Sequence, residues 1–296
     1  MLLLNRFPIK VHIWGGLGSQ CFAWALAIDL KVKFPTRRVH LIQHDAGVTR
    51  RKSEISFLNE EFRITSIQDF VENFSLGVSH SPFDNISYKV KTRARSIFRK
   101  VILSFGIIAQ ANDDYAFAKL KPWVLSLRGH YSHRTISEST FLAMSKNQHG
   151  PFNLKQQQFG EPIEYLGLHW RLGDLRNLKQ KKPLDSRRII DTVKLISKIN
   201  AQIQEVRIAS DSISHALFEF DSNFSFPRNC SKSTSTIPSL KEMISSNIFV
   251  GTNSKLSVWI AIARFYQLKN AISYLPVEII HHVPLEARTH SSTIIY

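Results

Sequence analysis

The run Tyr165-Leu-Gly-Leu-His-Trp-Arg-Leu-Gly-Asp174 opens as an apolar strand and closes on polar side chains. In open α/β sheets, ligands bind at the carboxyl ends of the strands, so we expect His169 and the residues after it to be functional. Arg171 offers a planar, permanently charged fork that suits a diphosphate, and Gly173 lets the backbone turn beside it. An arginine and an aspartate that end a strand can also simply pair with each other, and this stretch alone leaves both interpretations open.

Composition narrows the class of protein. The chain has 296 residues, of which 43% are hydrophobic, enough for one large core or two moderate ones. Its 39 Lys and Arg outnumber its 23 Asp and Glu, which gives a formal net charge of +16. This excess indicates an anionic partner, which could be a nucleic acid, a phosphorylated substrate or a membrane surface.

Cysteine usage and hydropathy bear on location. Cys21 and Cys230 form neither a disulfide framework nor a metal-ligand spacing, which fits a reducing compartment. The N-terminus is too short for a signal peptide, because Lys10 and His12 follow at once. No apolar run approaches the roughly 20 residues that span a bilayer. We therefore expect a cytoplasmic protein.

The second half of the chain alternates strands and helices as a doubly wound sheet does. A stretch rich in Gln, Gly and Pro, residues 147–162, precedes it and is the best linker candidate. The sequence therefore predicts two domains, residues 1–150 and residues 151–296. In the second we expect strands at 163–169, 205–210, 247–251 and 271–275, and helices at 185–199 (capped by Asp185), 212–219, 238–245 and 254–266.

The first half opens with a predicted strand at residues 9–14, a glycine-rich turn and a helix at 21–34. Backbone N–H groups at such a helix start favour anions, which makes Gly16 and Gly18 candidate donor-binding residues. The turn lacks the lysine of a P-loop and the full dinucleotide-binding spacing, so its glycines could serve only a tight crossing. Further predicted elements are a strand at 38–43 that leaves His44 and Asp45 at its end, a helix near 54–62, a strand at 124–131 and a helix at 138–146.

Residues 89–108 form a basic amphipathic segment in which Lys and Arg alternate with Val, Ile and Phe. Such a segment could lie on an anionic membrane surface or hold a lipid-linked acceptor. It could equally be a solvated basic helix packed on a domain.

Three predicted strand ends in the second half carry polar clusters. Because neighbouring strand ends lie side by side, these clusters could converge on a nucleotide: hydroxyls and helix N-termini for phosphate, Arg171 for the diphosphate charge, and Asp211 for N1 and N2 of guanine. Asp211 and Ser254 could instead only cap helices. The clusters are His169 with Arg171 and Asp174; Ser210, Asp211 and Ser212; and Gly251, Thr252, Asn253, Ser254 and Lys255.

The order of these motifs resembles that of the α-1,2-fucosyltransferase family, glycosyltransferase family 11, and of the wider GDP-fucose-dependent transferases. The resemblance runs from residue 11 to about residue 275. Residues 15–25 match the family pattern G-G-L-G-N-Q-x-F-x-x-A, and residues 169–174 match H-x-R-x-G-D. Ala209-Ser210-Asp211 matches F-S-D. The pattern N-S-x-x-S-x-W-x-A is matched by Asn253, Ser254, Ser257, Trp259 and Ala261. A family strand G-Y-x-Q-S is echoed by residues 129–132.

The resemblance implies a GT-B-like α/β fold, in which two Rossmann-like domains face each other across a cleft. It implies an acceptor-side first domain and a second domain that binds GDP-fucose. It further implies that Arg171 neutralises the β-phosphate, that His169 and Asp211 lie by the guanosine, and that Ser254 with its neighbours Asn253 and Lys255 contacts phosphate. Transfer would invert configuration and need no metal or other cofactor.

Several residues depart from the family pattern. Leu172 and Leu175 replace a second arginine and an aromatic residue, Ser19 replaces asparagine, and Lys255 replaces a small polar residue. Because of these changes, the donor could also be a related GDP-sugar or another 6-deoxyhexose. The protein could also be an inactive relative that binds a nucleotide sugar.

The expected activity is transfer of L-fucose, in α-1,2 linkage, to a glycan or lipid-linked glycan in bacterial O-antigen, lipopolysaccharide or surface polysaccharide synthesis. The enzyme would contact the inner face of the cytoplasmic membrane peripherally. Asp174, Asp45 and His44 are positional candidates for the general base. A nucleic-acid-binding protein is the remote alternative, and no interleaving of basic and aromatic residues favours it.

Overall fold

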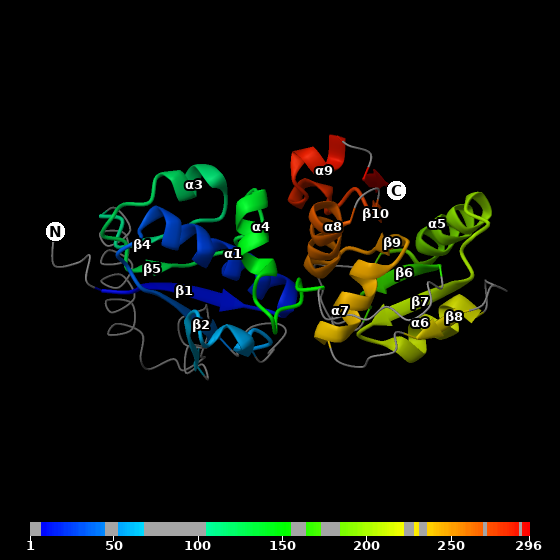
Figure 1. Cartoon of the computed structure of the whole chain (residues 1–296), viewed down its shortest axis with the longest axis horizontal. Coiled ribbons are helices and arrows are strands. Elements are labelled where there is room, and N and C mark those ends of the chain that lie inside the picture. The colour runs from blue at the N-terminus through cyan, green and yellow to red at the C-terminus, as the bar shows by residue number, and fades with distance from the viewer. Residues whose placement is uncertain are drawn as a thin grey trace, which may run out of the picture. The chain divides into compact units, whose positions relative to one another are not determined.

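The computed structural model describes residues 7–44, 53–67, 105–154, 164–172, 184–221, 228–230, 236–268, 271–289 and 292–296. The chain folds into two compact units, Met1–Arg134 and Thr135–Tyr296 (Figure 1). Asp45, Gly173, Asp174 and the basic residues at positions 89–100 lie outside the described ranges.

The second unit is built on a six-stranded parallel sheet with the strand order β11-β10-β9-β6-β7-β8. Numbered from its own first strand, this is the order 6-5-4-1-2-3 of a dinucleotide-binding fold. The strand order reverses between β6 and β9, so their carboxyl ends form the topological switch point at which such sheets bind ligands. The strands are β6 Tyr165–Trp170, β7 Glu205–Ser210, β8 Arg228–Cys230, β9 Ile248–Gly251, β10 Ile272–Leu275 and β11 Thr293–Ile295.

Helices cover both faces of this sheet. Side chains alternate across a strand, so Leu166, Leu168 and Trp170 of β6 share one face, where they pack with apolar residues of α5 and α6. Gly167 and His169 point to the other face, toward α7 and α8. The helices are α4 Glu138–Ser145, α5 Ser186–Ile199, α6 Ile213–Asp221, α7 Thr236–Ser245, α8 Lys255–Gln267 and α9 Leu285–Thr289, with a 3₁₀ turn at Ile280–His282.

Two strand glycines allow the helices on this second face to pack closely. A Cβ at Gly167 would lie 2.8 Å from Oγ of Ser246, and a Cβ at Gly251 would lie 2.6 Å from Cδ2 of Leu275 and 2.7 Å from Cβ of Ser257. Any larger residue would therefore push a helix or a neighbouring strand away from the sheet.

A buried arginine joins α8 to the start of two strands. Arg264 is 0% exposed, and its partners are carbonyl and hydroxyl oxygens. Burial lowers the pKa of Arg264 to about 9. Its guanidinium donates to the carbonyl oxygens of Ile244 (2.8 Å), Ser246, Asn247 (3.0 Å) and Ile272 (3.1 Å), and to Oγ of Ser273 (3.2 Å).

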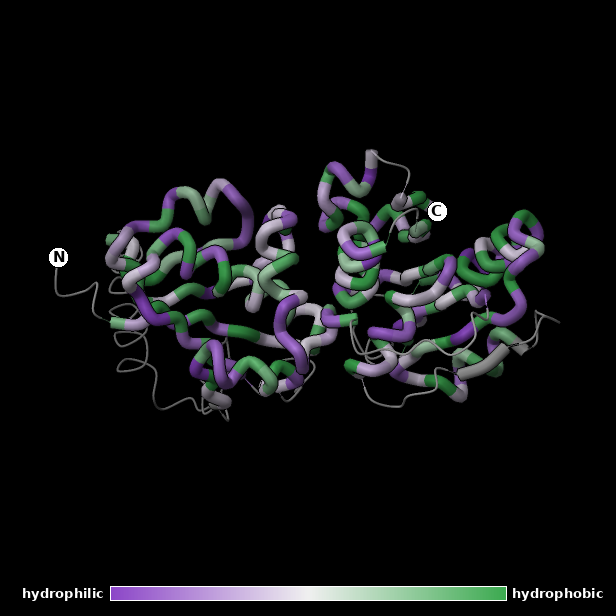
Figure 2. Tube along the Cα trace, viewed as in Figure 1, coloured by the Kyte–Doolittle hydropathy of each residue, from purple (hydrophilic) through white to green (hydrophobic). Residues whose placement is uncertain are grey.

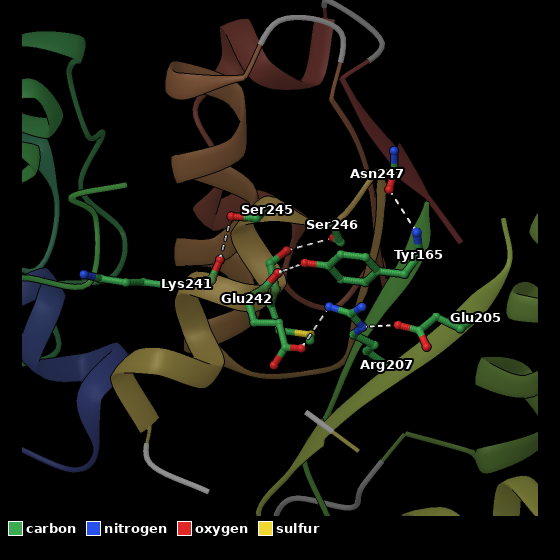
Figure 3. A network of polar contacts seen from close by, with 9 residues as sticks. Tyr165, Glu205, Arg207, Lys241, Glu242, Ser245, Ser246 and Asn247 are labelled. Carbon is green, nitrogen blue, oxygen red and sulfur yellow. Dashed lines mark hydrogen bonds and ion pairs between the residues drawn. The ribbon is translucent and has the colours of Figure 1, made fainter. Parts of the chain in front are cut away.

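A second polar network lies at the amino ends of β6 and β7 (Figure 3). Arg207 contacts the carboxylates of Glu205 and Glu242, the latter at 3.3 Å, and lies 3.9 Å from the ring centroid of Tyr165. The Tyr165 hydroxyl donates to the Glu242 carbonyl at 2.6 Å, and burial raises its pKa to about 12. Because ligands bind at the opposite edge of such sheets, this network is structural.

The first unit contains a five-stranded parallel sheet in the order β3-β2-β1-β5-β4. Helix α1 is buried on nearly all sides, and hydrophobic residues follow it and the central strands (Figure 2). The elements are β1 Ile9–Trp14, α1 Leu17–Lys33, β2 Val39–His44, a 3₁₀ turn Ser56–Leu58, β3 Arg63–Ile67, β4 Ile108–Ala109, α3 Asp114–Ala118 and β5 Ser126–Leu127. Both halves of the chain are therefore α/β units with parallel sheets, as predicted.

The division of the chain falls after Arg134, earlier than the predicted position near residue 150. Aromatic packing explains this position, because α4 and the residues after it pack on α8. The Phe141 ring lies 5.2 Å from that of Tyr266, and the Phe152 ring lies 5.3 Å from that of Trp259. Residues 147–154 thus belong to the second unit.

Other predicted elements differ in extent. The helix expected near residues 54–62 is a single 3₁₀ turn, Ser56–Leu58, and the strand expected at 124–131 shrinks to Ser126–Leu127. Helix α1 begins at Leu17, inside the glycine-rich turn. Strands β8 and β11 have only three residues each, too few to show a strand pattern in the sequence. Within the described ranges, no helix has the length and apolarity that a membrane span requires.

We predict that Arg264→Leu lowers the free energy of unfolding of the second unit by about 3 kcal/mol or more, because several buried carbonyl oxygens lose their donor. Denaturant unfolding followed by tryptophan fluorescence measures this change. The exposed Arg187 provides the control, and Arg187→Leu should change stability by less than about 0.5 kcal/mol. A loss below about 1 kcal/mol for Arg264→Leu would contradict this role.

Candidate functional site

Thr252 joins the carboxyl ends of β6 and β9, where His169 lies opposite Gly251. Its Oγ1 donates to the carbonyl oxygen of His169 at 3.1 Å and accepts from the backbone N–H of Arg171 at 3.0 Å. The Thr252 N–H also reaches the His169 carbonyl, at 3.2 Å. The Thr252 side chain thus fixes the backbone at His169 and at Arg171, the two predicted ligand-binding residues on either side of Trp170.

The His169 ring is held from the side of α8. Its Nδ1 lies 2.7 Å from Oγ of Ser257, which accepts the backbone N–H of Thr252 at 3.1 Å. Burial and then the charge of Arg171 lower the pKa of His169 to about 4, and the charge of Asp211 partly opposes them. His169 is therefore neutral near pH 7. The charges of Arg171 and Asp211 both act on this ring, so residues from two predicted clusters lie near one another: His169 and Arg171 from the first, and Asp211 from the second.

Asp211 follows β7, and its side chain forms a hydrogen bond with the chain that follows β6. Its Oδ1 accepts the backbone N–H of Leu172 at 2.8 Å, while the residue as a whole is exposed. Beside it, Oγ of Ser210 accepts the N–H of Ser212 at 3.1 Å at the start of α6. Asp211 therefore ties the end of β7 to the residue that follows Arg171.

Ser254 caps α8, as one of the two interpretations of its position predicted. Its side chain accepts the N–H of Leu256 at 3.2 Å, and the residue is buried. The first turn of α8 contains no acidic residue, and Asn253 and Lys255 flank the cap at intermediate exposure. The positive end of the helix dipole is thus not offset by an acid of its own first turn. Phosphate contacts of Asn253, Ser254 and Lys255 stay predictions.

At the glycine-rich turn of the first unit, side chains of the protein itself bind the backbone. Gly15 adopts a left-handed φ of 92°, and Gln20 donates from Nε2 to its carbonyl oxygen at 3.0 Å. The first N–H of α1, that of Leu17, donates to Oε2 of Glu54 at 2.9 Å, and Glu54 in turn donates its N–H to Oε1 of Gln20 at 2.8 Å. A carboxylate of the protein itself therefore lies at the helix start where Gly16 and Gly18 were expected to meet a phosphate. That donor contact stays a prediction.

His44, a positional candidate for the general base, forms a pair with His12. Nδ1 of His12 lies 2.7 Å from Nε2 of His44, and both rings are buried. Trp14 stacks on His44 with ring centroids 4.4 Å apart. The other two candidates, Asp45 and Asp174, fall outside the described residues.

Four residues of these sites carry no individual signal in the sequence. Thr252 and Ser257 stand out only as members of motifs, and the side-chain amide of Gln20 only as a match to a family pattern. Glu54 gives no signal, because its contact depends on the packing of a 3₁₀ region against a helix 37 residues away in sequence. In contrast, the position of His169 and Arg171 at a strand end was readable from the sequence.

Comparisons with known proteins give remote similarities of structure. No family model and no curated protein sequence matches the chain. The fold is similar to that of a glycosyl transferase family 9 protein from Veillonella parvula, at a TM-score of 0.49 and 9% identity over 99% of this chain and 86% of that one.

Two other similar structures carry bound nucleotides. The Escherichia coli heptosyltransferase WaaC with ADP has a TM-score of 0.45 and 8% identity over 98% of this chain and 92% of that one. POFUT1 in complex with GDP has a TM-score of 0.37 and 10% identity over 89% of this chain and 96% of that one. At 8–10% identity, these similarities concern the fold and not a family or an activity.

We predict that His169 titrates near pH 4 and that Arg171→Gln raises its pKa, because removal of the neighbouring charge makes imidazolium less unfavourable. The folded pKa lies below the ordinary 6.5, so the folded state binds fewer protons than the unfolded state between these values. The stability that His169 contributes is thus present above pH 6.5 and is lost as the pH falls toward 4. An NMR titration of histidine ring resonances measures both values. A pKa near 6.5 in the wild type would contradict the assignment.

Proposed function

We propose that the second unit binds a nucleoside diphosphate sugar at the carboxyl ends of β6 and β9, and that the protein is a glycosyltransferase. The observation that carries this proposal is the convergence of His169, Arg171 and Asp211 at the topological switch point, next to the start of α8. A cation, a neutral ring, a carboxylate and a helix N-terminus provide separate groups for the phosphates and the base of a nucleotide.

Arg171 has the charge that a departing diphosphate needs. When the bond between sugar and diphosphate breaks, negative charge grows on the leaving phosphate, and a fixed cation stabilises that transition state more than the ground state. Thr252 holds the Arg171 backbone from one side and Asp211 holds the next residue, Leu172, from the other. The guanidinium therefore projects from a backbone that is fixed on both sides, which favours preorganised electrostatic catalysis.

The donor proposed is GDP-fucose, with inversion at the sugar and α-1,2 transfer to a glycan hydroxyl. The order of motifs in the sequence supports this choice, and the exposed carboxylate of Asp211 suits the N1 and N2 donors of guanine. Another GDP-sugar or 6-deoxyhexose donor would use the same diphosphate contacts. We assign the acceptor to a glycan or lipid-linked glycan of a bacterial surface polysaccharide, with the basic residues at positions 89–100 in contact with anionic lipid.

We predict that GDP raises the melting temperature of the wild-type protein and that Arg171→Ala removes most of this shift while the unliganded melting temperature changes little. A thermal shift series over GDP concentration measures it. The matched control is Lys198→Ala, an exposed cation in the last turn of α5, which should keep the full shift.

The donor sugar is tested separately, by hydrolysis of a panel of nucleotide sugars. GDP-fucose should be consumed faster than ADP-, UDP- or other GDP-sugars. Absence of any GDP shift in the wild type would refute the donor site, and a faster reaction with another GDP-sugar would refute fucose alone.

A further inference from the structure

The hydrogen bonds around Ser257 fix where its single hydroxyl proton goes. Its Oγ accepts the backbone N–H of Thr252 at 3.1 Å, so this contact uses a lone pair and leaves the proton available. Ser257 is 0% exposed, so its hydroxyl does not contact bulk solvent. Among the described residues, its second hydrogen-bond contact is with Nδ1 of His169, at 2.7 Å.

Two arrangements of protons are possible between the Ser257 hydroxyl and Nδ1 of His169, and one of them pairs every polar atom of the serine side chain. If the Ser257 hydroxyl donates to Nδ1 of His169, every polar atom of the serine is paired. If Nδ1 instead carried a hydrogen, Oγ would accept two N–H groups, and its own buried hydrogen would have no acceptor among the described residues. A buried donor without an acceptor is unfavourable, so the first arrangement wins.

A neutral imidazole carries one ring proton, and the tautomer follows from the bond at the other nitrogen. We propose that Ser257 fixes His169 in the tautomer protonated at Nε2, so that the ring presents a neutral N–H donor to the ligand at the carboxyl end of β6. Ser257 is thus a positioning residue that acts through His169. The low pKa of His169 agrees with this assignment, because the ring does not gain a second proton near neutral pH.

The tautomer restricts what His169 can recognise. A neutral Nε2–H donates to an acceptor such as a carbonyl oxygen, a phosphate oxygen or an unprotonated ring nitrogen. It cannot accept from a sugar hydroxyl or a nucleobase amino group. This ligand preference rests on the proposed function, whereas the tautomer itself is a property of the ligand-free protein.

The experiment is a long-range ¹H–¹⁵N correlation spectrum of the ligand-free protein labelled with ¹⁵N-histidine, near neutral pH. Loss of one set of ring signals in His169→Gln assigns the residue. We expect Nδ1 of His169 at the shift of an unprotonated nitrogen and Nε2 at that of a protonated one. A wild-type spectrum with Nδ1 protonated, or with both nitrogens protonated, would overturn the proposal, whether or not any variant folds.

Two serine variants test the cause. Ser257→Ala removes the hydroxyl donor, so the His169 signals should move toward a mixture of tautomers, while the melting temperature reports whether the unit stays folded. Ser245→Ala is the matched control, because the Ser245 hydroxyl bonds to the Lys241 carbonyl within α7 at 3.0 Å. It should leave the His169 signals unchanged. A folded Ser257→Ala protein with the wild-type tautomer would contradict the role of Ser257.

The Kd of GDP, measured beside the tautomer of His169, distinguishes failure of the Ser257 role from failure of the proposed donor site. We expect Ser257→Ala to raise the Kd of GDP by roughly tenfold, the effect of one misdirected hydrogen bond of about 1.4 kcal/mol. If the wild type shows the Nε2-protonated ring but does not bind GDP, the tautomer is right and the donor assignment is wrong. If it binds GDP with an Nδ1-protonated ring, the donor assignment stands and the role of Ser257 is refuted.

Discussion

The Thr252 hydroxyl is the interaction on which the candidate site depends. Strand β9 ends at Gly251, and the parallel ladder between β6 and β9 ends with it. Beyond that point, Thr252 continues the connection with its side chain: it donates to the carbonyl oxygen of His169 and accepts the N–H of Arg171. The backbone of β6 is therefore held for two residues past its ladder with β9. Without this hydrogen-bond pair, the backbone at Arg171 would lose its support on the β9 side and would depend on the contact between Leu172 and Asp211.

Each unit contains a strand, a turn and a helix in sequence, but the groups at the two helix starts, those of α1 and α8, differ in charge. In the first unit, the Glu54 carboxylate accepts the N–H of Leu17, so a fixed negative charge already lies at the start of α1. In the second unit, the start of α8 has a neutral cap, Ser254, and no acid in its first turn. An incoming anion would compete with Glu54 at α1 but would meet no such carboxylate from the first turn of α8. Under the proposed function, this contact of Glu54 favours α8 over α1 as the helix start that would hold an anion.

Much of the second unit could be predicted from its sequence, because several of its strands have mostly apolar interiors and its helix caps are local. The β7 strand and the Asp185 cap are observed at the predicted positions, and β6 ends within one residue of its predicted end. The features that sequence did not reveal depend on contacts between distant residues. An arginine on an apolar helix would ordinarily face solvent, yet Arg264 lies inside and binds carbonyl oxygens up to 20 residues away. The contacts of Glu54, and the pairing of His12 with His44, likewise required the packed fold.

A neutral histidine beside Arg171 has a physical advantage over a second cation. Two like charges at one partly buried strand end would repel each other and would each lose hydration. Burial and the Arg171 charge already act together to remove the proton from His169. A ring that carries its one hydrogen on Nε2 still supplies a directional donor, so the site gains a second hydrogen bond without a second charge. Under the proposed function, the charge that would stabilise a leaving diphosphate is then concentrated on Arg171, whose backbone N–H is held by Thr252. Charge and directional recognition are thus divided between two residues two positions apart on one strand end.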